Sequence, residues 1–373
     1  MHAYKPSPAV ATQRAGEVDF DIHRLAGVRL INASAAEAAA VTRQLGPLQG
    51  AIDREPDIVV RFVDQLETGP AMRLLGVAEA GFTDDTFLVL RGKHKSPAKV
   101  AFDFGQLGGQ TEIVCERGVA AVPLLIPILN LALLARGILP LHASAFVHEG
   151  RGVVVTGWSK GGKTEALLAF ARRGAEYVGD EWVYISPDGG SVFGIPEPIR
   201  LWHWHLRQLP EIESTIGNRE RTRLRALQLL LRRERALRRI GGERLIALLR
   251  GQHHVDVLPE RLFGGLGQLT ARFDRLFLLV SHAGRDTSID RIDPLEIGRR
   301  MVYSLRHESL DLTAAYLKFR FAFPDAGNPF LAQMERLQRE LLERAVVGKP
   351  AYIVRHPYPC SLNVLFDVMS PYA

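Results

Sequence analysis

Hydrophobic residues in the first third of the chain alternate with polar ones over short runs, a pattern typical of half-buried strands. These runs are rich in β-branched and aromatic residues, and clusters of Gly, Asp or Lys separate them. One stretch, 35–45, has helical spacing instead. The pattern predicts a small α+β domain over residues 19–118, after a flexible tail at 1–18. Its predicted strands are 57–63, 85–92, 99–105 and 111–118.

The pattern changes after residue 118, where strand-like and helix-like segments intermix as they do in α/β proteins. We therefore predict one α/β domain over residues 119–373. Its expected strands are two around a turn at 149–152, then 177–186, a broken strand at 192–202, 275–281 and 351–357. Its expected helices are 164–173, one or two within 218–250, 294–323 and 329–347.

The most apolar stretch, 119–135, is almost long enough to span a membrane, which takes about 20 apolar residues. Two prolines and Asn130 interrupt it, and Arg117 and Arg136 close it at both ends. These features favour a buried core helix over a membrane span.

Composition and charge describe a globular protein with one basic segment. The 373 residues are 47% hydrophobic and 24% charged, with a net charge of +6. Eleven arginines and three glutamates between 218 and 250 carry +8, so the rest of the chain is near −2. The two cysteines, Cys115 and Cys360, lie far apart in the sequence and predict no disulfide framework. Because the first residues also lack an apolar signal core, we expect a cytoplasmic protein.

A glycine-rich loop is the clearest chemical motif. Residues 157–164 read GWSKGGKT and fit the consensus G-x-x-x-x-G-K-[ST], with an apolar run before them and a helical pattern after them. In such loops the backbone N–H groups surround phosphates, the lysine reaches the terminal phosphates, and the hydroxyl of the last residue binds Mg²⁺. The helix that begins there adds the positive end of its dipole.

An acidic pair follows this loop at short range. Asp180 and Glu181 lie 17 and 18 residues after Lys163, which leaves room for one helix, a turn and one strand. Many nucleotide hydrolases with such a loop carry their second acidic motif on a separate apolar strand. Here the best later strand, 275–281, ends without an acidic residue.

Together these motifs resemble the catalytic core of HPr kinase/phosphorylase and its relatives, which share a phosphoenolpyruvate-carboxykinase-like fold. The resemblance rests on an LHA strand around His142, the glycine-rich loop, an Arg-Gly turn at Arg173 and the sequence GDE that ends at Glu181. The spacings also agree with the family, with 21 residues from His142 to Lys163 and 17 from Lys163 to Asp180. About 45 residues carry the likeness strongly.

The resemblance implies an ATP- and Mg²⁺-dependent kinase. Lys163 would neutralise the transferred phosphoryl group, Asp180 would accept the proton of the attacking hydroxyl, and His142 would lie near the phosphates. The implied metal ligands are Thr164, Asp180, Glu181 and Glu197, and Arg200 would contact phosphate or substrate. The implied nucleotide-binding residues are Gly157, Trp158, Ser159, Lys160, Gly161, Gly162, Lys163, Thr164 and Glu165.

Three features depart from the family pattern. The second acid is Glu181, where the family has aspartate. The family's later glutamate and Arg-Gly-rich strand are matched only by Glu197 and Arg200, at a different spacing. Lys160 stands where relatives commonly have glycine, so we expect it to contact a phosphate or an incoming anionic group.

The acceptor is the main open question at this point. A kinase acting on a serine hydroxyl of a protein or peptide competes with an ATPase or nucleotide-gated binding module that holds a partner with its basic helices. A small-molecule kinase is the third alternative, and phosphorolysis and a homo-oligomeric state stay open.

The basic segment and a histidine pair allow more than one interpretation. The segment 218–250 is either a solvated hairpin that turns at 241–242 or a docking surface for an acidic partner. It lacks the interleaved aromatic residues of single-strand binders, so nucleic acid is not favoured. His203 and His205 would share one face of a strand, but no third metal ligand accompanies them, and aromatic packing is expected instead.

Overall fold

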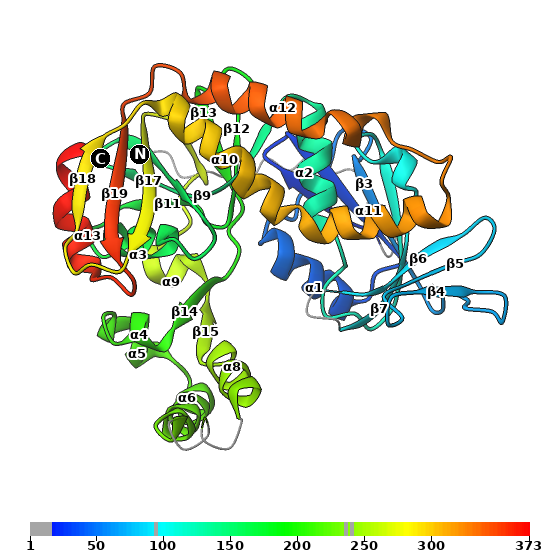
Figure 1. Ribbon diagram of the computed structural model, residues 1–373, viewed down its shortest axis with the longest axis horizontal. Helices are drawn as coiled ribbons and strands as arrows, with labels where there is room; N and C mark the ends of the chain where they lie inside the picture. The colour runs from blue at the N-terminus through cyan, green and yellow to red at the C-terminus, as the bar shows by residue number, and fades with distance from the viewer. Residues whose placement is uncertain (1–16, 93–95, 235–237, 239–241) are drawn as a thin grey trace.

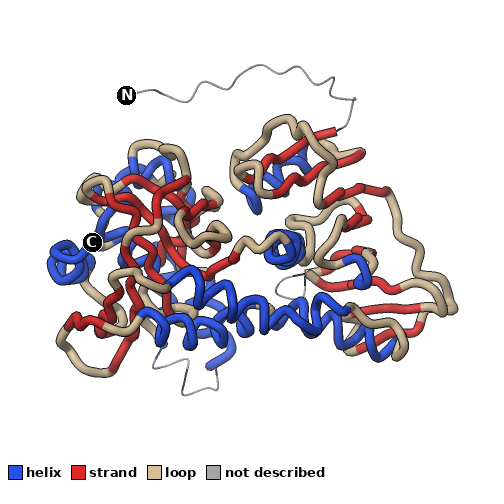
Figure 2. The backbone as a smooth tube through the Cα atoms, turned by 90° about the horizontal axis from the view of Figure 1, so that it is seen from above, coloured by secondary structure: helices blue, strands red, loops and turns tan. Residues whose placement is uncertain are grey.

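Two mixed β-sheets carry the fold, and helices pack against both of them (Figure 1). The computed structural model describes residues 17–92, 96–234, 238 and 242–373. Within them the protein is mixed α/β, as the sequence predicts. Figure 2, from above, shows the strands at the two ends of the molecule and long helices running between them.

The first sheet is formed by the N-terminal region in the order β1-β2-β3-β8-β7-β6-β5-β4. Its inner strands β2, β3 and β8 are parallel to one another, and its remaining pairs are antiparallel. The strands are β1 (Glu17–Ile22), β2 (Ala26–Ile31), β3 (Ile58–Val63), β4 (Arg73–Leu75), β5 (Ala80–Phe82), β6 (Phe87–Arg91), β7 (Pro97–Ala101) and β8 (Thr111–Glu116).

The second sheet has the order β16-β13-β12-β9-β10-β17-β19-β18, with β11 also paired to β9. Strand β10 is antiparallel to β9 and parallel to β17, which in turn is parallel to β19. The strands are β9 (Leu139–His148), β10 (Arg151–Gly157), β11 (Glu176–Gly179), β12 (Trp182–Ile185), β13 (Ser191–Gly194), β16 (Thr270–Arg272), β17 (Arg275–His282), β18 (Ser288–Arg291) and β19 (Ala351–Pro357).

Helices cover the second sheet on both faces, which explains why its central strands are apolar at nearly every position. Side chains alternate along β10, so Val153 and Val155 pack with α3 and α13 while Val154 packs with α10 and α12. The helices are α1 (Ala35–Leu45), α2 (Leu125–Ala135), α3 (Lys163–Ala171), α4 (His203–Leu206), α5 (Pro210–Thr215), α6 (Asn218–Leu231), α8 (Glu243–Gly251), α9 (Pro259–Phe263), α10 (Pro294–Glu308), α11 (Leu310–Ala322), α12 (Pro329–Val346) and α13 (Leu362–Met369).

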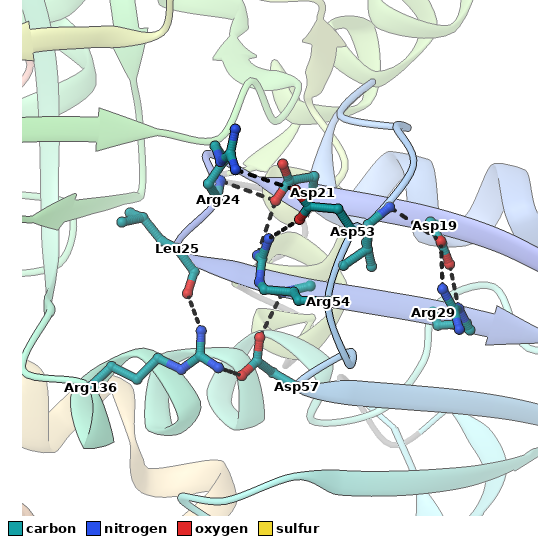
Figure 3. A network of polar contacts seen from close by, with 11 residues as sticks. Asp19, Asp21, Arg24, Leu25, Arg29, Asp53, Arg54, Asp57 and Arg136 are labelled. Carbon is teal, nitrogen blue, oxygen red and sulfur yellow. Dashed lines mark hydrogen bonds and ion pairs between the residues drawn. The ribbon is translucent and has the colours of Figure 1, made fainter. Parts of the chain in front are cut away.

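The core of the first sheet extends beyond residue 118. Leu125 and Leu129 of α2 and Leu312 of α11 are buried in the same hydrophobic cluster as β1, β2, β3 and β8. An ionic network also anchors the end of α2 to this sheet (Figure 3). There Arg136 forms an ion pair with Asp57 and donates to the carbonyl oxygen of Leu25 at 2.7 Å. Helix α2 is therefore built into the N-terminal unit.

A basic arm projects from the second sheet. It consists of the antiparallel strands β14 (Ile199–Trp202) and β15 (His254–Val257) and the two helices α6 and α8 that they carry (Figure 1). Leu224 and Ile246 are buried on the inner sides of these helices, whereas Leu229 and Leu248 are 61% and 57% exposed. Of the turn expected at 241–242, Gly241 lies outside the described residues.

The structure corrects two of the predicted elements. The single helix expected at 294–323 is two helices, because Ser309 leaves helical geometry and caps both the end of α10 and the start of α11. The strand expected at 177–186 is β11 and β12. Glu181 between them has a φ of 61°, which a continuous strand cannot adopt.

The apolar stretch at 119–135 forms the buried helix α2, which begins only at Leu125. None of the described helices is both long enough and apolar enough to cross a membrane. Cys115 and Cys360 are buried free thiols in two different hydrophobic clusters, so they form no disulfide with each other.

Candidate functional site

The glycine-rich loop, residues 157–164, connects β10 to α3 at an end of the second sheet. Its glycines are required because other chain segments approach closely. A Cβ atom on Gly157 would lie 2.6 Å from the carbonyl oxygen of Leu279 on β17, and one on Gly162 would lie 2.5 Å from Nε2 of His356 on β19. Gly162 also has a φ of 105°, which favours glycine. The strand-loop-helix context that the motif requires is therefore present.

Lys163 is buried inside this loop. Its side chain is 6% exposed, and its ammonium donates to the carbonyl oxygen of Trp158 at 3.2 Å. Burial lowers the pKa of Lys163, and nearby acids, Glu181 and Asp180 foremost, offset part of that effect. The backbone N–H groups of Gly162, Lys163 and Thr164 donate to no other group in the described part of the chain. The loop thus offers one cation and several free donors to an anion.

Asp180 is held directly beside the loop. Its Oδ2 accepts from the hydroxyl of Thr164 at 3.0 Å, and its Oδ1 accepts from the hydroxyl of Ser144 on β9 at 2.6 Å. Burial raises the pKa of this carboxyl to about 6, and the charge of Glu181 contributes to the shift. A carboxyl group with a pKa near neutrality is suited to accept a proton. The acidic pair lies where the sequence predicts it, at the turn between β11 and β12.

His142 lies between two carboxylates. Its Nε2 is 3.0 Å from Oε2 of Glu181, and its Nδ1 is 3.1 Å from Oε1 of Glu308 on α10, although the second pair is not aligned for a hydrogen bond. Burial alone would lower the pKa of His142, but the two carboxylates outweigh it, so the pKa is raised. A histidine with acids at both nitrogens is favoured as the doubly protonated cation.

Glu165 lies on another side of the first turn of α3. Its Oε1 is 3.0 Å from Nε2 of His205, and both side chains are buried. Nδ1 of His205 accepts from the backbone N–H of Trp202 at 3.0 Å, so the proton of the neutral ring lies on Nε2 and is donated to Glu165. His203 instead stacks on His253 with 4.6 Å between ring centroids.

The expectation that His203 and His205 share one face of a strand is wrong. The two residues lie in the short helix α4, where positions two apart point in different directions. Aromatic packing and the bond to Glu165 take the place of a paired metal site. No group of three or more His, Cys, Asp or Glu side chains in the described regions is arranged to hold a metal ion.

Arg200 is the predicted site residue that the structure places elsewhere. It lies on β14 in the basic arm and pairs with Asp256 on β15 at 3.1 Å. Glu197 is half-buried in the connection from β13 to β14. Burial raises the pKa of the nearby Tyr177, and the charges of Asp180 and Glu197 raise it further. Glu197 and Asp180 therefore both lie near Tyr177, so Glu197 is close to the site. Arg200 is paired with Asp256 in the basic arm instead.

The outer edge of the loop carries Trp158, Ser159 and Lys160. Trp158 is 53% exposed and stacks on His307 of α10 with 4.9 Å between ring centroids. The turn is closed by the N–H of Gly161, which donates to the carbonyl oxygen of Trp158 at 3.0 Å. Lys160 is exposed with a φ of 59°, in the left-handed region where glycine is favoured. Its contact with phosphate stays a prediction.

The donor set at this site fits Mg²⁺. The Thr164 hydroxyl and the Asp180 carboxylate are hard oxygen ligands, and Mg²⁺ is commonly held by one or two carboxylates together with water and substrate phosphates. A nearby cation would also relieve the burial of the Asp180 charge, which is the cause of its raised pKa.

Three residues around the loop were missed by the sequence analysis. Ser144 could have been found, because it follows His142 by two positions on one strand and must share its face. Glu308 and His356 gave no signal, since each reaches the loop from a distant segment. His356 lies 195 positions from Gly161, whose carbonyl oxygen is 2.9 Å from its Nε2.

Comparison of the sequence with models of known protein families gives no match, and comparison with curated proteins gives none either. The interpretation of the site therefore rests on its own geometry and chemistry.

Proposed function

We propose that this protein is an ATP-dependent phosphotransferase related to HPr kinase, which transfers the γ-phosphoryl group to a serine hydroxyl of a protein or peptide acceptor. One observation carries the proposal. The carboxylate of Asp180 is held by the loop's own Thr164 and by Ser144, next to the buried Lys163. The proposed base therefore lies beside the loop that would bind the phosphates, and phosphoryl transfer to a hydroxyl requires such an arrangement.

The loop would bind and orient the triphosphate. The free N–H groups at the start of α3 would donate to the phosphate oxygens, and the ammonium of Lys163 would neutralise the transferred group. Thr164 and Asp180, with Glu181 and Glu197 as further candidates, would hold Mg²⁺, which supplies positive charge to the phosphates when bound. These contacts would be strong because the lysine and Asp180 lie in a poorly solvated environment.

Asp180 would then act as the base. The acceptor oxygen attacks the γ-phosphorus, the bond to the β,γ-bridging oxygen breaks, and ADP leaves. The proton of the acceptor hydroxyl passes to the Asp180 carboxylate. General-base catalysis of this kind typically contributes about 10²- to 10⁴-fold to a rate. His142, between Glu181 and Glu308, would fix the position of Glu181 and add a second positive charge.

Transfer of labelled phosphate tests the proposal. The protein is incubated with Mg²⁺ and ATP labelled in the γ-phosphoryl group in native lysate, and labelled species are identified by mass spectrometry. Asp180→Asn should reduce transfer at least about 100-fold while ATP still binds. Asp188→Asn is the matched control, because this exposed aspartate closes a turn with Ser186 and Gly190 and makes no hydrogen bond to the loop residues 157–164, all of which the structure describes. Full transfer by Asp180→Asn would rule out Asp180 as the base.

A second candidate function follows from the basic arm. Arg232 and Arg233 are exposed and have no charged partner within the described residues, and Leu229 and Leu230 are exposed beside them. Such a surface would suit an ATPase or nucleotide-gated module that holds an acidic partner. ATP turnover without any phosphorylated acceptor would favour this alternative. A labelled metabolite in place of a labelled protein would favour a small-molecule kinase.

A further inference from the structure

Two chain segments meet beside the first turn of α3, on a side of the loop that the proposed chemistry does not use. One is α4, which carries Trp204 and His205. The other is the segment after β19, which carries Tyr358 and Cys360. Gln208, just after α4, joins them, because its amide donates to the carbonyl oxygen of Cys360 at 3.1 Å. Figure 1 shows the segment below β19 descending to α4.

Both segments are anchored to the glycine-rich loop. His205 donates to Glu165 in the first turn of α3. Burial raises the pKa of Tyr358, and the nearby carboxylate of Glu165 raises it further. Two residues before Tyr358, His356 contacts the carbonyl oxygen of Gly161 at 2.9 Å. The two segments therefore keep a fixed position relative to the N–H groups of the loop.

The aromatic rings at this junction form a partly open corner. The rings of Trp204 and Tyr358 meet edge to face, with centroids 5.7 Å apart and an interplanar angle of 79°. Trp204 is half-buried against His205, whereas Tyr358 is 42% exposed. Aromatic rings that are held in place and still partly exposed are the groups on which nucleobases stack.

The direction of a bound nucleotide is set by the rest of the site. The γ-phosphate of the nucleotide would lie where Lys163 and Thr164 meet Asp180, because the proposed metal ligands and the proposed base are on that side of the loop. The nucleoside must therefore leave the loop on a different flank. Glu165, next in sequence to Thr164, is turned by about 100° around the helix axis and faces the aromatic corner.

We infer that Trp204 and Tyr358 form the binding site for the base of the nucleotide, which stacks against their exposed ring surfaces. This inference rests on the proposed nucleotide-binding function. The ligand class is a purine nucleoside triphosphate, because a two-ring base offers the larger stacking area. Trp158 lies on the other side of the loop, with His307 and Glu308, where the acceptor would bind.

The test separates the base from the phosphates. Calorimetry measures the affinity of the full chain for MgATP and for magnesium tripolyphosphate, which has no base. Trp204→Ala should weaken ATP binding about 10- to 100-fold and leave tripolyphosphate binding within about twofold. Tyr358→Leu should act in the same direction more weakly. Both variants should also reduce any preference for ATP over CTP.

Trp202→Ala is the matched control, because this tryptophan lies two positions away but meets His254 edge to face in the basic arm, with 5.2 Å between ring centroids. It should leave both affinities unchanged. Unchanged ATP affinity in both Trp204→Ala and Tyr358→Leu would overturn the inference while the phosphate site stands. An equal loss for both ligands would also overturn it, because the rings would then only support the loop. If the unsubstituted protein bound neither ligand, the proposed function itself would fail.

Discussion

The glycine-rich loop and the basic arm both carry several charged side chains, but these side chains differ in their exposure to water. At the loop, Lys163, Asp180 and Glu165 are nearly inaccessible to water, and the two acids have partners from other elements, Ser144 and His205. In the arm, Arg238 and Arg250 share Glu234, and both arginines are more than half exposed. The first region concentrates charge in the interior, and the second spreads it over the surface.

The difference in burial indicates which region is the better candidate for catalysis. Buried charges cost stability unless they are paired, and they shift pKa values toward the range useful for catalysis. Exposed ion pairs are typically worth only about 0–1 kcal/mol and are screened by salt. The loop is thus the candidate for chemistry, while the arm is a candidate for association. Substitutions in the two regions should differ accordingly.

The largest expected effect is on nucleotide binding by Lys163→Met. Loss of the ammonium should weaken MgATP binding roughly 100-fold or more, since a charge-assisted contact to phosphate is removed. The melting temperature should stay the same or rise, because a buried charge is also removed. Lys349→Met is the control, as its ammonium donates to the carbonyl oxygen of Phe273 at 2.7 Å, away from the loop. Normal ATP binding by Lys163→Met would contradict the assignment of this region.

The next effect is on pH dependence. In the free protein the pKa of Asp180 is raised to about 6, and a base must be deprotonated to work, so kcat/KM, measured with MgATP well below its KM, should fall about tenfold per pH unit below pH 6. Because the charge of Glu181 contributes to this shift, Glu181→Gln should move the fall to lower pH. Initial rates between pH 4.5 and 8 measure both profiles. If the fall in rate at low pH occurred at the same pH in Glu181→Gln, a group other than Asp180 would control it.

A smaller effect is expected at Lys160, which is charged but exposed at the edge of the loop. Its φ of 59° costs a non-glycine residue about 1 kcal/mol, so Lys160→Gly should stabilise the fold by about that amount in chemical denaturation. If the ammonium contacts a phosphate or an anionic acceptor, the same variant should bind nucleotide or acceptor several-fold more weakly. Gain of stability with unchanged binding and turnover would show that Lys160 points to solvent.

The smallest effect is expected in the arm. Replacing both Arg232 and Arg233 with alanine should change the free energy of unfolding by less than about 0.5 kcal/mol, because surface substitutions without a partner seldom cost more. ATP affinity should not change either. A loss of several kcal/mol, measured by chemical denaturation, would mean that the arm is part of the structural core and would remove the contrast with the loop.

Much of the fold could be predicted from local pattern. Helix α1 and strand β19 begin and end where their spacing predicts, because each buries one face or both in a regular way. The helix break at Ser309 and the strand break at Glu181 were missed, because the apolar pattern on either side continues through them. Strands β14 and β15 pair only with each other, so their place in the arm was decided by tertiary contacts.

What the sequence by itself determined is the loop with its lysine, its hydroxyl and the acidic pair one strand later. These features could be recognised because a phosphate-binding turn is a contiguous backbone conformation with its own residue requirements. Only the tertiary structure decided that Ser144 and Thr164 share Asp180, that Glu308 faces His142, and that Trp204 and Tyr358 lie together near the loop. These partners come from separate elements. The pairing of β11 with β9 brings Asp180 to Ser144, the packing of α10 on the sheet brings Glu308 to His142, and α4 is joined to the segment after β19 by a hydrogen bond.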